Sequence, residues 1–131
     1  MPIAKLSVVT LILSLSTATA HAEFYSKVAA SGATIRLYRA SSTNPDCSTA
    51  GEPIVRLTQS PQHGRIRLAR TRVYINFPPN NLRSACNRSG VRGVLVSYVS
   101  QRGYTGPDSA AIDVFYPSGN VRQASFDIAV R

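Results

Sequence analysis

The stretch RGYTGPDSAAIDVFYPSGN, residues 102–120, decides the fold of this chain of 131 residues. It opens with a cluster of turn-forming residues and runs directly into apolar residues at every second position. Gly103 and Gly106 tolerate backbone angles that are closed to other residues, and Pro107 fixes its own φ. Asp108 is expected to accept hydrogen bonds from backbone N–H groups just after it. We therefore predict a corner that carries the chain from one strand to the next, and between the two sheets of a sandwich.

Alternation with a period of two dominates the chain after its first 22 residues, and no helical period competes with it. Turn residues such as SPQHG (60–64) and PSGN (117–120) separate the alternating segments. We expect seven or eight strands, whose centres are residues 25–29, 35–38, 55–57, 66–68, 73–77, 94–98, 110–116 and 124–130.

The last two segments allow a prediction of register. Their apolar residues, at even positions in both, must share one face, so opposed residue numbers have an even sum. Ile112 is expected opposite Phe126, which would place Asp127 opposite Ala111. The connecting loop then has three residues, 118–120, or five.

Two motifs resemble a known family. Tyr98 followed by Gly103-Tyr104-Thr105-Gly106-x-Asp108-Ser109 resembles the Y-x-P-x-x-G-F-x-G-x-D-S-F-x-Y signature of bacterial cadherin-like, immunoglobulin-like (Big-type) domains of secreted and surface proteins. Pro61-x-His63-Gly64-Arg65-Ile66 is similar to the P-x-x-G-x-(V/I) turn of the same domains. The resemblance covers about residues 53–131, with Ser100 where the family has proline and with Ala110 and Ile112 where it has aromatics. It implies an immunoglobulin-like, cadherin-like Greek-key β-sandwich, present here as a single domain. The expected structural corner comprises Tyr98, Gly103, Tyr104, Gly106 and Asp108.

The first 22 residues have the features of a signal peptide. Lys5 gives a positive start, LSVVTLILSLS (6–16) is an apolar run too short to span a bilayer, and Ala20-His21-Ala22 matches the A-x-A cleavage pattern. We expect cleavage after Ala22, with cleavage after Ala20 as the alternative. The remaining 131 − 22 = 109 residues, 23–131, form a single predicted domain without a membrane span, located in the periplasm or secreted.

Cys47 and Cys86 are expected to form a disulfide, because an exported chain with two cysteines meets an oxidising compartment. Closing a loop of about 40 residues is worth roughly 4 kcal/mol in the chain-entropy model. Neither cysteine has a second cysteine or a histidine at ligand spacing, so we expect no metal site and no cofactor. Asp108 is interpreted as a turn residue, with a calcium ligand as the alternative.

The residues do not suggest catalysis. The histidine that remains after cleavage is His63, in a polar turn, and both cysteines are expected to be oxidised. Asp113 and Asp127 are the one carboxylate pair worth weighing, as predicted diagonal neighbours about 7–8 Å apart on a flat face without a cleft. We therefore expect that the protein is not an enzyme.

Positive charge is the strongest hint about a partner. The formal charge of +9 falls to +8 without Lys5, and 13 of the 14 remaining basic residues are arginine. Several of them fall at polar-face positions of predicted strands, beside tyrosines. Such a face would hold a polyanion, namely nucleic acid, lipopolysaccharide phosphates or acidic polysaccharide; the alternative is a solvated surface whose charge deters aggregation. The candidate residues are Arg36, Arg56, Arg65, Arg67, Arg72, Tyr38 and Tyr74.

The resulting functional expectation is a small exported, non-catalytic module that binds or has a structural, adhesion-type role in the bacterial envelope or exterior. The alternatives are a polyanion-binding module, for which nucleic acid is not the favoured ligand, and a secreted enzyme inhibitor. The loops that carry Cys47 and Cys86 are the expected place of recognition, since loops on a rigid sandwich commonly carry it.

Overall fold

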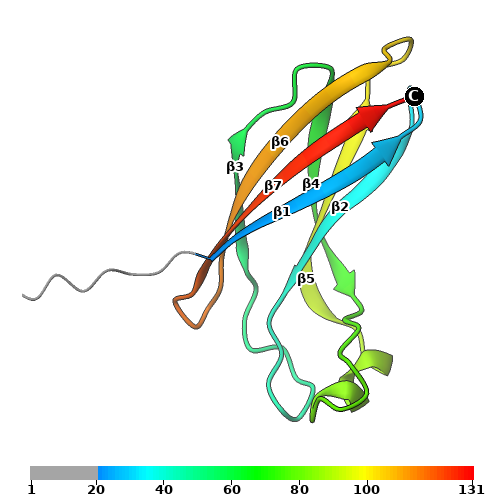
Figure 1. Ribbon diagram of the computed structural model, residues 1–131. Coiled ribbons are helices and arrows are strands. Elements are labelled where there is room, and N and C mark those ends of the chain that lie inside the picture. The colour runs from blue at the N-terminus through cyan, green and yellow to red at the C-terminus, as the bar shows by residue number, and fades with distance from the viewer. Residues whose placement is uncertain (1–20) are drawn as a thin grey trace, which may run out of the picture.

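The computed structural model describes residues 21–131, which form seven strands and one short 3-10 helix in two sheets (Figure 1). The elements are β1 (His21–Ala29), β2 (Thr34–Ser41), β3 (Ile54–Gln59), β4 (Gly64–Val73), η1 (Ser84–Arg88), β5 (Val91–Ser100), β6 (Gly106–Phe115) and β7 (Val121–Val130). One sheet has the order β1-β7-β6-β3 and the other β2-β5-β4. The prediction of an all-β fold with seven or eight strands is confirmed. Residues 1–20 of the predicted signal peptide lie outside the described residues, and its last two residues begin β1.

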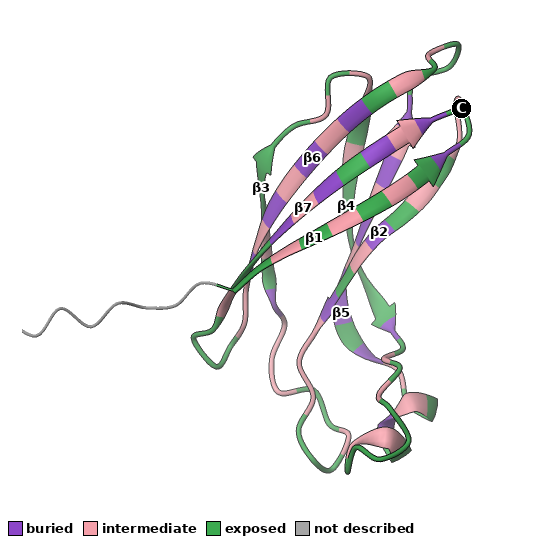
Figure 2. Cartoon of the chain, viewed as in Figure 1, coloured by how far each residue is buried: buried purple, intermediate pink, exposed green. Residues whose placement is uncertain are grey.

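The core lies between the two sheets and is built from every second residue of the central strands. Buried positions alternate along β5, β6 and β7, as Figure 2 shows by colour. Tyr98, Ile112, Val96 and Val114 are fully buried, and Phe126 is 1% exposed. The even-numbered positions of the last two strands therefore face inward, as the alternation predicts.

β4 is one continuous strand of ten residues that extends the strand predicted at residues 66–68, whereas the strand predicted at residues 73–77 is wrong beyond Val73, because residues 74–78 form no strand. The intervening residues Ala69, Arg70 and Thr71 continue the antiparallel ladder with β5. Because side chains alternate along a single strand, Arg72 shares a face with Ile66 and lies opposite to Arg65 and Arg67. This difference divides the predicted basic face.

The final hairpin has the predicted parity but a different register. Ile112 pairs with Ala124 rather than with Phe126, and the loop has five residues, 116–120. The backbone N–H of Tyr116 donates to the carbonyl of Asn120, which closes this longer loop. Asp127 therefore pairs with Ser109, four residues along β6 from Asp113, which is about 13 Å. The expected diagonal pair of carboxylates is wrong.

The corner between β5 and β6 connects the two sheets through Asp108, which is 8% exposed. Its carboxylate accepts hydrogen bonds from the backbone N–H groups of Ser109 (2.9 Å), Gln62 (2.9 Å) and His63 (3.0 Å) and from the Tyr98 hydroxyl (2.8 Å). Burial alone would raise the pKa of this carboxyl, but the four hydrogen bonds outweigh it and hold the pKa below its usual value. Asp108 thus fastens the β3–β4 turn to the β5–β6 corner, a longer-range contact than the local one that the sequence predicts.

Tyr104 and Gly106 complete the corner beside Asp108. The His63 ring lies parallel to the Tyr104 ring, with centroids 3.8 Å apart, and the Tyr104 hydroxyl donates to the Pro107 carbonyl at 2.6 Å. Gly106 has φ +138°, and a Cβ added there would lie 2.8 Å from the Tyr104 hydroxyl. Glycine is therefore required at this position for both backbone and space.

The predicted disulfide is confirmed and joins Cys47 to Cys86, which are 39 residues apart. Cys47 lies in the β2–β3 loop, and Cys86 lies in η1, within the long connection between β4 and β5. Both segments extend past the lower end of the sheets in Figure 1. The disulfide therefore holds two irregular segments together at one end of the sandwich.

Candidate functional site

Three of the predicted basic residues share the outer face of the β2-β5-β4 sheet. Arg36 of β2 and Arg67 of β4 both pair with Ser97 of the central strand, from its two sides. Two strand spacings separate them, about 10 Å. Arg65 lies in the next row, opposite Val99. We call Arg36, Ser97 and Arg67 the basic row.

The remaining predicted residues lie elsewhere. Arg56 is on the outer face of the other sheet, paired with Asp113 and lying over the Phe115 ring at 5.2 Å. Arg72 points to the opposite side of β4 and donates to the Gly90 carbonyl at 3.0 Å. Tyr74 follows the end of β4, and Tyr38 packs against the core. The seven residues therefore do not form one surface.

The edge strands β1 and β2 lie side by side at one side of the sandwich (Figure 1). A basic groove lies between these two strands. We call it the β1/β2 groove; it has a volume of about 350 Å³ and is lined by Glu23, Tyr25, Lys27, Arg36, Leu37, Tyr38, Arg39 and Arg122. It continues into a second hollow of about 520 Å³, with which it shares Tyr38, Arg39 and Arg122. The two concavities thus form one path along the edge of the molecule.

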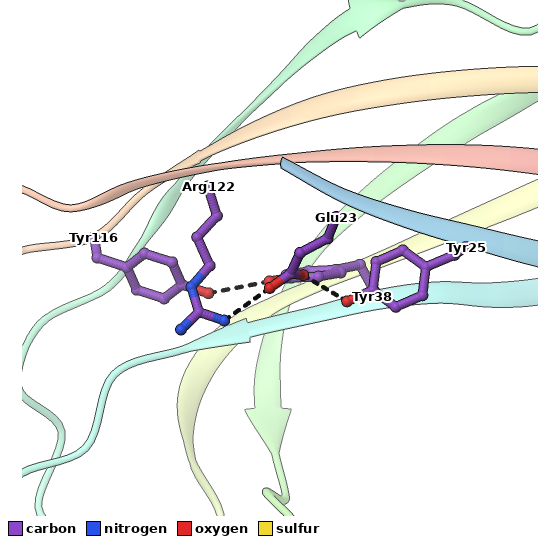
Figure 3. A network of polar contacts seen from close by, with 5 residues as sticks. All are labelled: Glu23, Tyr25, Tyr38, Tyr116 and Arg122. Atoms are coloured by element: carbon purple, nitrogen blue, oxygen red, sulfur yellow. Dashed lines mark hydrogen bonds and ion pairs between the residues drawn. The ribbon is translucent and has the colours of Figure 1, made fainter. Parts of the chain in front are cut away.

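A network of polar contacts lies at the groove and the adjoining hollow, and its Tyr38–Tyr116 contact links β2 to the loop after β6 (Figure 3). The carboxylate of Glu23 accepts a hydrogen bond from the Tyr25 hydroxyl at 2.5 Å and pairs with the Arg122 guanidinium at 3.0 Å. The hydroxyls of Tyr38 and Tyr116 lie 3.4 Å apart. Burial raises the pKa of Tyr25 and Tyr116, and the hydrogen bonds to Glu23 and Tyr38 raise it further. Both tyrosines are therefore neutral donors at physiological pH.

Aromatic rings lie in and beside the groove and contact its cations. Tyr25 stacks on Phe126 with centroids 5.4 Å apart and meets Tyr38 edge-on at 6.1 Å. Lys27 lies 5.8 Å from the centroid of the Tyr25 ring, and Arg122 lies 5.7 Å from that of Tyr116. Cation–π contacts of this kind orient the positive groups on a rigid base.

The groove has a strong excess of positive charge. Among the described residues its lining contains four cations, Lys27, Arg36, Arg39 and Arg122, and one carboxylate, that of Glu23, so the formal balance is 4 − 1 = +3. Arg122 already pairs with that carboxylate, which leaves the other cations without a competing acid in the lining. Such a surface concentrates and binds anions.

Sequence reasoning missed Tyr25, Arg39, Tyr116 and Arg122 as site residues, although a signal for two of them was present. Tyr116 and Arg122 have the same parity as the buried positions of β6 and β7, which places them on the inner face at the end of the hairpin. An inward arginine at a strand end requires a partner, and Glu23 of the parallel neighbour β1 provides it. That parallel pairing of distant segments has no local signal in the sequence.

No metal centre or membrane helix accompanies the groove in the part of the chain that the structure describes. Within residues 21–131, no three His, Cys, Asp or Glu side chains gather closely enough to hold a metal ion. No helix in the same range has the length and apolar character needed to cross a bilayer.

Comparisons with known proteins do not assign the chain to a family. No protein-family model matches it, and no curated protein sequence matches it. Among solved structures, the solution structure of amebosin is similar, with a TM-score of 0.44 and 15% sequence identity, over 85% of this chain and 98% of that one. A likeness of this size carries no conclusion about function.

Proposed function

We propose that this chain is an exported, non-catalytic binding module with an immunoglobulin-like Greek-key sandwich, and that its partner is anionic. The strand order supports the fold. β2-β5-β4 corresponds to the B-E-D strands of an immunoglobulin sandwich, and β3, β6 and β7 correspond to its C-F-G strands. β1 lies parallel to β7 instead of pairing with β2. The contact between the β3–β4 turn and the corner also unites the two motifs that resemble the cadherin-like domains.

Export is supported by the disulfide. The bond between Cys47 and Cys86 requires an oxidising compartment to persist, which suits the periplasm or the exterior. It agrees with the signal-peptide features of the first 22 residues.

Anion binding depends on one observation: Arg36 belongs both to the β1/β2 groove and to the basic row. Positive charge is therefore continuous from Lys27 in the groove, past Arg36, to Arg67 on the outer face of the sheet. An extended anionic chain lying across β2 would meet these cations in succession. Arginine suits this role, because its planar guanidinium binds carboxylates and phosphates in a bidentate manner.

A comparison of two double variants with equal charge tests the proposal. Arg36→Gln with Arg67→Gln removes two neighbouring cations from the proposed surface. Arg56→Gln with Arg88→Gln removes two exposed cations outside it, one on β3 at the far edge of the other sheet and one in η1. Arg122 does not serve as a control, because it lines the groove. The salt concentration that elutes each protein from immobilised heparin is the measurement, with urea melts to verify folding. We expect a clearly larger decrease for the first pair; equal decreases would mean a basic surface without a site.

A further inference from the structure

The hollow that continues the β1/β2 groove is built by the disulfide. We call it the disulfide hollow; its lining includes Tyr38, Arg39, Thr43, Arg83, Tyr116 and Arg122. Thr43 lies in the loop that carries Cys47, where it bridges to Thr49. Arg83 directly precedes η1, and its carbonyl accepts from the backbone N–H of Cys86 at 2.9 Å. The disulfide therefore brings two walls of the hollow together.

Two buried polar atoms of this lining lack a partner. Within residues 21–131, the buried side-chain nitrogen and oxygen atoms without a hydrogen bond are Thr43 Oγ1 and Arg83 Nε. Both atoms are themselves buried, so a ligand in the hollow would not reach them. The terminal guanidinium nitrogens of Arg83 are not among the buried unpaired atoms, and Arg83 lines the hollow, so they are the part of this side chain that a ligand could contact.

The charge of the hollow favours an acidic ligand. Its cations are Arg39, Arg83 and Arg122, and its described lining contains no Asp or Glu. Arg122 is engaged by Glu23, and one terminal nitrogen of Arg39 donates to the Tyr74 carbonyl. Arg83 is therefore the guanidinium most available to an incoming anion.

The neutral groups of the hollow favour a sugar over a nucleobase. Hydroxyls of Tyr38, Tyr116 and Ser118 and the amide of Asn120 line it, and these groups can both donate and accept, as sugar hydroxyls require. Nucleobases bind single-strand grooves mainly by stacking on aromatic rings. In the hollow, the Arg122 guanidinium already lies over the Tyr116 ring, and the Tyr38 ring already meets the Tyr25 ring edge-on, so neither ring is open for stacking by a base.

We propose that the disulfide hollow binds one carboxylated sugar unit of an acidic polysaccharide, with the terminal guanidinium nitrogens of Arg83 on the carboxylate. The assignment rests on the proposed function and names the ligand class of the same basic surface. The chain of the polysaccharide would leave the hollow along the β1/β2 groove, since the two concavities share lining residues.

Titration of the full exported chain with a galacturonate trisaccharide, followed by calorimetry, tests the assignment. Arg83→Gln is compared with Arg88→Gln, a matched loss of charge at an exposed position of η1. We expect the wild type to bind and Arg83→Gln to lose roughly tenfold or more in affinity, because a hydrogen bond to a charged group is worth about tenfold or more in affinity. Arg88→Gln should lose less than about twofold in affinity.

Further probes separate the possible failures. Maltotriose, the neutral counterpart, should not bind. A hollow that binds oligothymidylate and not the trisaccharide overturns the assignment, as does equal affinity of the two arginine variants. If the trisaccharide fails while heparin retention still depends on Arg36 and Arg67, the hollow is wrong and the proposed function stands. If that dependence fails too, both are wrong.

Discussion

Replacing Asp108 with alanine removes the anchor of the corner and should destabilise the protein strongly. The carboxylate accepts four hydrogen bonds of 2.8–3.0 Å, from the Tyr98 hydroxyl and from three backbone N–H groups. Tyr98 is fully buried, and its hydroxyl keeps only a weaker contact, at 3.3 Å, with the His63 carbonyl. The variant therefore leaves a buried hydroxyl and at least one backbone donor without a good partner.

The size of the effect follows from those contacts. A hydrogen bond to a charged group contributes about 1.5–3 kcal/mol, and an unpaired buried donor costs about 1–3 kcal/mol. Water can replace the carboxylate at Gln62, which is exposed, so the four contributions do not add in full. We expect Asp108→Ala to lower the free energy of unfolding by about 3–4 kcal/mol, a large part of the 5–15 kcal/mol typical of a domain.

Urea melts at neutral pH measure this change, with Asp113→Ala as the control. Asp113 lies on the outer face of β6, the strand that also carries Asp108, and its replacement should cost no more than about 0.5 kcal/mol. A double-mutant cycle with Tyr98→Phe should give a coupling energy of about 1–2 kcal/mol between the two side chains. Equal melting curves for Asp108→Ala and Asp113→Ala, or a coupling energy near zero, would show that the Asp108 carboxylate does not anchor the corner.

Gly106→Val should lower the free energy of unfolding by about 2–3 kcal/mol in the same melts, because φ is +138° and the added Cβ meets the Tyr104 hydroxyl. Gly103→Ala should lower it by less, because no atom lies within 4 Å of the added Cβ. Reduction of the Cys47–Cys86 disulfide should lower the free energy of unfolding by roughly 4 kcal/mol, and intact-mass measurement with alkylation should find no free thiol before reduction. Because the folded-state pKa of Asp108 is depressed below its unfolded value of about 3.9, its contribution to stability is fully present above that pH and is lost as the pH falls through the folded pKa. The stability difference between the wild type and Asp108→Asn should therefore shrink in melts below about pH 4 and stay constant between about pH 5 and 7.

Local alternation was sufficient to predict the strands, because one buried face imposes a period of two wherever a strand crosses the core. It predicted the inward positions of β6 and β7 and the parity of their hairpin. It failed within β4, where Ala69, Arg70 and Thr71 lie on an edge strand and are exposed. With little burial on either face there, the sequence showed no alternation, and the strand was predicted too short. Residues 74–77 alternate in sequence but form no strand.

The surface was harder to predict, because sheet membership is not a local property. Arg56 and Arg67 both occupy outward positions of consecutive strands, yet β3 and β4 belong to opposite sheets. The β1/β2 groove requires the pairing of β1 with β7, segments about 100 residues apart, which places Glu23 beside Arg122. No pattern within a strand encodes that contact.

The most direct test of anion binding along the groove and the basic row is its footprint by NMR. Isotope-labelled protein is titrated with a short acidic oligosaccharide, and the shifts of the backbone amides and arginine side chains are followed. We predict that the largest changes fall on Lys27, Arg36, Arg39, Arg67 and Arg83. Changes spread evenly over all arginines, including Arg56 and Arg88 outside the proposed surface, would contradict anion binding at this site.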